Sequence, residues 1–169
     1  VVEQVKKAHP NCLTIVGGAN IQSNPSDNRA FLKSNPSIDC LVYDDGEFPF
    51  ASLIELLLKY TGEKDPISLI KRTPVDGVRS LVDDQIVMGK PSDNVQELDV
   101  VPSPYLMGLF DDLLQIPDLM PIIQNVRGCP YLCSFCVSGS QGHKIRSFSY
   151  ERVISEIEYF KKNSKNHVL

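Results

Sequence analysis

The chain has 169 residues, of which 42% are hydrophobic and 22% charged, and its formal net charge is −4. This balance does not favour a nucleic-acid-binding surface or an acidic disordered tail, and the length allows one domain or two incomplete ones. No apolar run approaches the roughly 20 residues that cross a membrane. The sequence opens on Val1 in the middle of a pattern, so we expect a fragment of a longer protein.

Cysteine usage indicates the setting. The chain has five cysteines, and three of them lie within the eight residues 129–136. A secreted disulfide scaffold would spread an even number along the chain, so a reducing, cytoplasmic setting with clustered thiols as metal ligands is favoured. Cys12 and Cys40 lie in or beside predicted strands and are interpreted as buried structural residues.

The first sixty residues alternate helix and strand signals. Apolar residues recur at helical spacing in some segments, and β-branched runs that end at glycine mark strands in others. In order, we predict a helix at 1–8, a strand at 13–16 that ends at Gly17 and Gly18, a helix at 28–34 with Asp27 as N-cap, a strand at 38–43, and a helix at 47–60 with Phe50, Leu53, Ile54, Leu57 and Leu58 on its apolar face and Gly62 after its end.

This order predicts parallel βαβ units, and hence the C-terminal half of a doubly wound, Rossmann-like α/β sheet. A small hairpin is predicted next, with strands at 77–82 and 85–88 around the Asp83-Asp84 turn. Residues 91–104 are rich in Pro, Asp and Ser and are typical of a linker. Residues 105–114 are expected to form a short helix.

The last segment is a strand at 121–126, a long loop at 127–146, and a helix to residue 163 with Ser149 as N-cap. Residues 167–169 would open a second strand. Strand, long functional loop and helix are typical of the first unit of a β/α barrel of the TIM type. We therefore divide the chain into a part at 1–62, a linker region with the hairpin at 63–118, and the start of a second domain at 119–169.

The long loop carries Cys129, Cys133 and Cys136 in the spacing Cys-x₃-Cys-x₂-Cys. Iron–sulfur clusters are held by thiolates, and three thiolates fill three corners of a four-iron cluster, which leaves the fourth iron open for a ligand. Two other interpretations stay open: a zinc site with His143 as fourth ligand, and free thiols.

The run from Arg127 to Cys136 resembles the radical S-adenosylmethionine (SAM) superfamily, whose signature is Cys-x₃-Cys-x-aromatic-Cys. The resemblance implies that Cys129, Cys133 and Cys136 ligate a 4Fe–4S cluster and that SAM chelates the open iron. Phe135 would pack near the adenine of SAM. Reductive cleavage of SAM would then give a 5′-deoxyadenosyl radical that abstracts hydrogen from an unactivated carbon, chemistry that the cofactors supply.

The flanking residues fit this resemblance. Arg127 and Gly128 precede the first cysteine as in the common Arg-Gly-Cys-Pro form, and a glycine lets the backbone approach the cluster closely. Arg127, Lys144 and Arg146 could offset the negative charge of the cluster. No catalytic acid or base is identifiable beyond the cluster ligands.

The N-terminal part resembles the end of a cobalamin-binding domain joined to a radical SAM domain. The resemblance implies that Gly17 and Gly18 lie along the nucleotide tail of cobalamin and that Gly46 and Glu47 belong to a loop beside the same tail. Residues 44–47 read Asp-Asp-Gly-Glu, where the family commonly has Gly-Glu-Gly-Glu. A vestigial domain without cobalamin is the alternative.

Together these features predict a cobalamin-dependent radical SAM enzyme, with methyl transfer to an unactivated carbon or a rearrangement as the reaction. The expected partners are a small-molecule, lipid-like or sugar-like substrate and an electron donor such as flavodoxin or ferredoxin. The fragment alone is expected to be inactive. The alternatives are a radical SAM enzyme that does not use cobalamin and a non-catalytic zinc-binding module.

Overall fold

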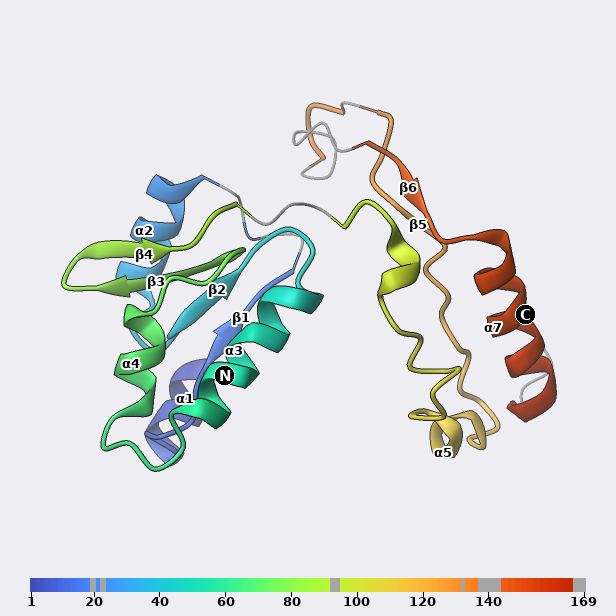
Figure 1. Cartoon of the computed structure of the whole chain (residues 1–169), viewed down its shortest axis with the longest axis horizontal. Coiled ribbons are helices and arrows are strands. Elements are labelled where there is room, and N and C mark those ends of the chain that lie inside the picture. Colours follow the sequence, from blue (N-terminus) through green and yellow to red (C-terminus); the bar gives the residue numbers. More distant parts are fainter. Residues whose placement is uncertain (19–20, 22–23, 92–94, 132, 137–143, 166–169) are drawn as a thin grey trace. The chain divides into compact units, whose positions relative to one another are not determined.

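A computed structural model describes the chain except residues 19–20, 22–23, 92–94, 132, 137–143 and 166–169 (Figure 1). The chain folds as two compact units, residues 1–94 and 95–169. No helix in the described ranges is long and apolar enough to cross a membrane. The strand predicted to open at 167 lies outside the described residues.

The first unit is an α/β structure built on one mixed sheet. Its strands follow the order β1-β2-β3-β4; β1 and β2 are parallel, and the other neighbours are antiparallel. The α/β class is therefore confirmed. Its elements are α1 (Val2–Ala8), β1 (Ile15–Val16), α2 (Pro25–Ser34), β2 (Cys40–Val42), α3 (Glu47–Lys59), α4 (Pro66–Arg72), β3 (Val78–Val82) and β4 (Gln85–Met88).

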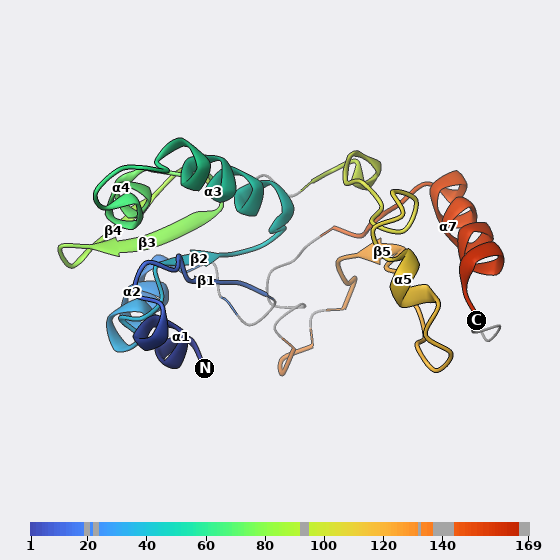
Figure 2. The same cartoon turned by 90° about the horizontal axis from the view of Figure 1, so that it is seen from below.

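Helices cover both faces of this sheet, with α3 and α4 on one face and α1 and α2 on the other (Figure 2). The alternation of side chains along β2 explains the layers. Cys40 and Val42 pack with Leu53 and Ile70 of α3 and α4, whereas Leu41 packs with Leu32 of α2 on the opposite face. All three β2 residues are buried, which is why this stretch reads as a continuous apolar run.

Helix α2 begins earlier than the sequence pattern indicated. Asn24 is its N-cap, and Asn24 Oδ1 accepts a 3.0 Å hydrogen bond from the Ser26 amide. Pro25 occupies the first helical turn, where its missing N–H costs nothing. The prediction of Asp27 as N-cap is therefore wrong, because Asn24 and Pro25 together give a stronger start signal.

Helix α3 also buries a narrower face than predicted. Leu53 is 1% exposed, whereas Phe50, Ile54 and Leu58 are 49%, 36% and 70% exposed. A helix that packs on a sheet with one side buries only the side chains that point at the sheet, and side chains that point to either flank of that side stay at the surface. The five-residue apolar face predicted for this helix is thus only partly buried.

The β3–β4 hairpin is confirmed, and it pairs with β2 as part of the first sheet. Asp83 and Asp84 form its turn with φ angles of 49° and 60°. Two positive φ angles in a two-residue loop are typical of a type I′ turn, in which Asp is tolerated. Arg29 and Lys33 of α2 form ion pairs with the Asp84 carboxylate and so tie that helix to the hairpin.

A buried polar cluster joins α1 to the sheet. The Asp39 carboxylate accepts hydrogen bonds of 2.8 Å each from the amide and the hydroxyl of Thr14. Lys6 Nζ lies 2.7 Å from the same carboxylate oxygen and also donates to the Cys12 carbonyl. Because Asp39 is 4% exposed, this charge is stable only with those partners.

The second unit contains η1 (Leu98–Val100), α5 (Asp111–Leu114), β5 (Val126–Arg127), β6 (Arg146–Ser147) and α7 (Tyr150–Asn163). Phe160 of α7 is 1% exposed and contacts Tyr105 edge-to-face at 4.5 Å. The Tyr105 hydroxyl donates a hydrogen bond to the Ile122 carbonyl. These contacts hold the 105–122 segment against α7.

Three predicted elements of this unit have different outcomes. The Ser149 N-cap is confirmed, since Ser149 Oγ accepts a 3.1 Å hydrogen bond from the Arg152 amide. The predicted helix at 105–114 is helical only at 111–114, because Gly108 has a φ of +71° that interrupts a helix. The predicted strand at 121–126 is limited to Val126.

Candidate functional site

The predicted glycine loops follow the two parallel strands of the first unit. Gly17 and Gly18 come directly after β1, and Gly46 and Glu47 come shortly after β2. Because β1 and β2 are parallel neighbours, their carboxyl ends meet at one edge of the sheet, where open α/β sheets bind ligands. The structure brings all four predicted residues to a single pocket of about 500 Å³.

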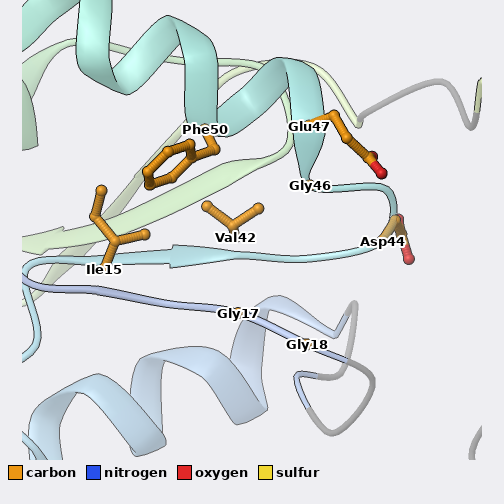
Figure 3. Close-up of a pocket in the computed structure, with 8 residues that line it drawn as sticks. All are labelled: Ile15, Gly17, Gly18, Val42, Asp44, Gly46, Glu47 and Phe50. Atoms are coloured by element: carbon orange, nitrogen blue, oxygen red, sulfur yellow. The ribbon is translucent and has the colours of Figure 1, made fainter. Parts of the chain in front are cut away.

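The pocket has an apolar end and an acidic end (Figure 3). Ile15, Val42 and Phe50 form the apolar end, and Phe50 comes from the first turns of α3. Asp44 and Glu47 place their carboxylates at the opposite end. Such a lining suits a ligand part that has a flat apolar ring and N–H or O–H groups, and it disfavours an anionic group placed directly beside the two carboxylates.

Two glycines allow the loops to approach Val42. A Cβ atom at Gly17 would lie 3.2 Å from the Val42 carbonyl oxygen, and one at Gly46 would lie 3.3 Å from Val42 Cγ1. Gly18 has a φ of +112°, a conformation open mainly to glycine. The glycines therefore allow close backbone approach at the pocket; that a ligand lies along these loops stays a prediction.

The loop after β2 is shaped by backbone conformation. Asp44 has a φ of 59°, and Gly46 is the N-cap of α3, with its carbonyl accepting a 2.9 Å hydrogen bond from the Phe50 amide. The 13-residue helix α3 consequently starts at the pocket edge. Helix N-termini carry partial positive charge, and this offsets part of the charge on Glu47 in the first turn.

The cysteine loop of the second unit is closed by a short neck. Strands β5 and β6 pair antiparallel on either side of the loop, with Val126 opposite Ser147 and Arg127 opposite Arg146. Outside the neck, the Phe148 amide donates a 3.1 Å hydrogen bond to the carbonyl of residue 125. The predicted ligands thus lie on one loop whose two ends are joined by backbone pairing.

The three thiols of this loop have different exposure. Cys129 and Cys136 are half-buried and Cys133 is exposed, and none of them is in a disulfide. The Cys136 amide donates a 3.0 Å hydrogen bond to the Cys133 carbonyl, which places these two ligands in one turn. Phe135 lies between them in sequence and is 91% exposed.

Among the described residues, no three Cys, His, Asp or Glu side chains lie close enough to hold a metal ion. The structure therefore does not gather Cys129, Cys133 and Cys136 into a formed site. The donor set itself, three cysteine thiols on one loop and outside any disulfide, suits an iron–sulfur cluster, and metal binding commonly draws ligands together. His143, the alternative zinc ligand, lies outside the described residues.

A strap formed by residues 95–101 fixes the exit of the cysteine loop. Arg146 donates a 2.6 Å hydrogen bond to the Val95 carbonyl, and the Ser149 amide donates one of 2.9 Å to Asp99 Oδ1. Arg152 donates to the Val101 carbonyl and pairs with Glu156 at 2.9 Å. Hydrogen bonding from Ser149, by its side chain and its backbone, lowers the pKa of the Asp99 carboxyl.

Cys40 and Cys12 belong to neither site. Burial, followed by the charge of Asp39, raises the pKa of the Cys40 thiol to about 12, so this thiol stays protonated and unreactive. Cys12 is half-buried, and its Sγ lies 3.7 Å from the Leu13 carbonyl oxygen. These environments agree with structural roles.

No protein-family model matches the chain. The chain is 33% identical over 166 residues to 2-(S-pantetheinyl)-carbapenam-3-carboxylate methyltransferase of Streptantibioticus cattleyicolor. The aligned region covers 95% of this chain and 23% of that relative. The chain is 31% identical, with the same coverage, to the cobalamin-dependent radical SAM methyltransferase TokK of Streptomyces tokunonensis. An anaerobic magnesium-protoporphyrin IX monomethyl ester cyclase of Synechocystis is 29% identical over 137 residues, 75% of this chain and 23% of the cyclase.

The chain is a homologue of cobalamin-dependent radical SAM methyltransferases. The family resemblance that the cysteine and glycine motifs suggested is thereby confirmed. The chain spans about a quarter of the length of these curated relatives. The roles of individual residues toward the cofactors stay predictions.

Sequence reasoning missed part of the lining of the pocket in the first unit. It selected the glycines and Glu47, but not Ile15, Val42 or Phe50. A usable signal was present, since Ile15 and Val42 lie near the ends of two predicted parallel strands, where ligand-binding residues gather. It also missed the strap, because Asp99 and Val95 lie in a stretch whose composition is typical of a linker.

Proposed function

We propose that this chain is part of a cobalamin-dependent radical SAM methyltransferase and contributes to both cofactor sites. The observation that carries the proposal is the alignment of 95% of the chain with TokK at 31% identity. Its cofactors would be a 4Fe–4S cluster, SAM and cobalamin. When bound, the cluster supplies the electron that cleaves SAM, and cobalamin carries the methyl group.

The pocket of the first unit would hold the nucleotide tail of cobalamin. Gly17, Gly18 and Gly46 would let the tail approach the backbone, and the apolar end would pack against its ring system. Carboxylate oxygens of Asp44 and Glu47 would accept hydrogen bonds from ligand N–H and O–H groups. Two observations support this: both glycine loops line one pocket, and a Cβ atom added at Gly17 or Gly46 would crowd Val42.

The cysteine loop of the second unit would hold the cluster through Cys129, Cys133 and Cys136. Phe135, with its ring free of protein contacts over most of its surface, would cover the adenine of SAM. The neck would keep the two ends of the loop together while the thiolates converge. An electron donor such as flavodoxin or ferredoxin would reduce the centre.

Methyl transfer is favoured over ring closure as the reaction. Two methyltransferases match 95% of the chain at 33% and 31% identity, whereas the cyclase of Synechocystis matches 75% at 29%. The acceptor would be an unactivated carbon of a small-molecule, lipid-like or sugar-like substrate. A radical SAM enzyme without cobalamin remains the alternative that the pocket experiment below separates.

The finer fold follows from the same proposal. Residues 1–62 would belong to the C-terminal half of a Rossmann-like cobalamin domain, and residues 119–169 would begin a TIM-type radical SAM barrel. Residues 63–94, with the β3–β4 hairpin, would complete the sheet of the first domain, and residues 95–118 would lead to the barrel. Support comes from the parallel β1–β2 pair with its helical crossover and from the loop between β5 and α7.

Anaerobic reconstitution of the chain with iron and sulfide, followed by EPR of the reduced protein with and without SAM, tests the cluster site. We expect a 4Fe–4S signal that SAM perturbs and that a Cys129, Cys133, Cys136→Ala triple variant lacks. A colourless protein that binds stoichiometric zinc under the same anaerobic conditions would replace the proposal with the zinc-binding module.

Equilibrium dialysis with hydroxocobalamin tests the pocket separately. We expect binding to the wild-type chain and a loss of at least about tenfold in affinity in Gly46→Leu, because the new side chain would occupy the space beside Val42. An exposed change on another helix, Ala30→Leu, serves as control. Cluster formation without any cobalamin binding would favour the radical SAM enzyme that does not use cobalamin.

A further inference from the structure

Helix α3 carries two phenylalanines that are equally exposed but differently placed. Phe48 is 51% exposed and Phe50 is 49% exposed. Side chains two residues apart on an α-helix point about 200° away from each other, so the two rings lie on roughly opposite sides of α3. Phe50 is one of the described residues that line the pocket of the first unit, and Phe48 is not. The place of Phe50 at a pocket therefore distinguishes it from an ordinary exposed phenylalanine.

The Phe50 side chain points from α3 toward the strands, and two aliphatic side chains point from the strands toward the helix (Figure 3). These are Ile15 of β1 and Val42 of β2, which lie on the sheet face that α3 and α4 cover. The Phe50 amide donates a 2.9 Å hydrogen bond to the Gly46 carbonyl, which fixes Phe50 beside the start of the helix. Three apolar side chains from three elements thus form one end of a space of about 500 Å³.

This apolar end fits a planar aromatic ring. A space of this size is typical of small-molecule sites, and aromatic rings stack on one another in offset or edge-to-face arrangements. Ile15 and Val42 are β-branched and offer stiff aliphatic surface to the other face of such a ring. A ring bound there would remove apolar surface of Phe50 from water, which favours binding in proportion to the area covered.

The same three side chains carry no hydrogen-bonding group, and this determines which rings bind well. Benzimidazole has a largely apolar bicyclic frame, whereas adenine carries an exocyclic amine and additional ring nitrogens. Polar groups that lose water without gaining a partner cost free energy, so adenine is disfavoured at this end. Sugar hydroxyls fit the other end, where the Asp44 carboxylate lies and can accept hydrogen bonds. A benzimidazole ribonucleoside presents its groups in this order.

We propose that Phe50 makes the pocket selective for corrinoids whose nucleotide carries a benzimidazole base. Its ring stacks on one face of the base, while Ile15 and Val42 contact the other face. The proposal rests on the proposed function, because it takes the ligand of the pocket to be a corrinoid with a nucleotide tail. The role assigned to Phe50 concerns the choice of ligand and no chemical step.

Equilibrium dialysis with three corrinoids tests this role. The probes are hydroxocobalamin, which has a dimethylbenzimidazole base, pseudocobalamin, which has adenine instead, and cobinamide, which has no nucleotide. We expect the wild-type chain to bind hydroxocobalamin at least about fivefold more tightly than pseudocobalamin. Phe50→Ala should weaken hydroxocobalamin binding by about two- to thirteenfold, the range for aromatic stacking. The variant should also reduce the preference over pseudocobalamin and leave cobinamide binding unchanged.

Phe48→Ala is the matched control, because it removes an equally exposed phenylalanine from the same helix. It should bind all three corrinoids as the wild type does. Both variants should keep the far-UV circular dichroism of the wild type, since both side chains are half-exposed. Unchanged hydroxocobalamin affinity or selectivity in Phe50→Ala would overturn the proposal, as would an equal loss in Phe48→Ala or a loss of cobinamide binding in Phe50→Ala.

Free α-ribazole, the ribonucleoside of dimethylbenzimidazole, distinguishes failure of the ring site from failure of the proposed function. In the wild-type chain it should shift the methyl NMR signals of Ile15 and Val42 and not that of Ile86, which packs on the opposite face of the sheet. If this occurs but no corrinoid binds, the ring site stands and the cobalamin function is wrong. If hydroxocobalamin binds equally to wild type and Phe50→Ala, the role of Phe50 is wrong and cobalamin binding stands. If no probe binds, both proposals are wrong.

Discussion

The backbone amide of Ser149, the N-cap residue of α7, donates a 2.9 Å hydrogen bond to the Asp99 carboxylate. This contact joins the strap to the helix that follows the cysteine loop. Ser149 is also an acceptor, because its Oγ accepts a hydrogen bond from the Arg152 amide in the first turn of α7. The start of α7 is therefore held by one hydrogen bond to the strap and by one within the helix.

The Asp99 contact predicts a pH dependence. Hydrogen bonding from Ser149 lowers the pKa of Asp99 in the folded chain, so the stabilisation is complete above the unfolded-state pKa and is lost as pH falls through the lower, folded-state value. Thermal unfolding of wild type and Asp99→Asn should differ at neutral pH. The difference should begin to shrink as the pH falls below about 3.9, the ordinary pKa of an aspartate, and should vanish only below the lower, folded-state pKa; a constant difference across the range would contradict the assignment.

The glycine next to β1 predicts a packing cost. In Gly17→Ala, the new Cβ would lie 3.2 Å from a backbone carbonyl oxygen, which cannot move as a side-chain end can. We expect the free energy of unfolding to fall by about 1–3 kcal/mol, as measured by urea denaturation. Ala30→Val, an exposed change on α2, should stay within about 0.5 kcal/mol of the wild type. Equal effects would mean that the Gly17 loop relaxes freely.

The buried Asp39 cluster predicts a large loss of stability. Asp39→Ala would leave the Lys6 ammonium and the Thr14 donors without their acceptor, and breaking a buried pair in this way costs about 3–5 kcal/mol. Glu3→Ala removes an exposed pair with Lys7 and should cost about 0–1 kcal/mol. Chemical denaturation of the two variants compares these values. Similar losses would show that Asp39 is solvated in the folded chain.

The cysteines should differ in reactivity. Burial raises the pKa of Cys40 to about 12 from 9.0, so its thiolate population at neutral pH should be lower by about a thousandfold. Iodoacetamide labelling followed by mass spectrometry should modify the exposed Cys133 early and leave Cys40 unmodified until the chain unfolds. Labelling in denaturant, where all five thiols react, is the control. Early labelling of Cys40 in the folded chain would contradict its burial.

Local signals predicted several elements in both units. The strand around Cys40, the hairpin turn at Asp83 and Asp84, and the Ser149 cap each depend on a few adjacent residues, and each is confirmed. The start of α2 was misplaced because Asn24 and Pro25 compete with Asp27 for the same role. The extent of the helix near residue 108 was overestimated because the conformation of Gly108 is set by its surroundings.

The candidate site was predictable only where its functional residues form a motif of near neighbours in the sequence. The cysteine spacing and the glycine loops were visible in the sequence, and the pocket joins the latter as expected. Phe50 was assigned to the core because it has helical spacing, yet it is half-exposed at the pocket. The Arg127–Arg146 opposition depends on strand register, which two residues on each side cannot specify by pattern alone.

Val42 contacts the space around both glycine loops, and it is itself a core residue that is 6% exposed. The Val42 carbonyl lies nearest to Gly17 and its Cγ1 lies nearest to Gly46, so this one residue separates the two walls of the pocket. A larger or smaller residue at 42 would change the width of the opening while the loops kept their sequences. Homologues could therefore adapt to ligands of different thickness through the hydrophobic core, and a survey of ligand-contacting loops alone would overlook this route of divergence.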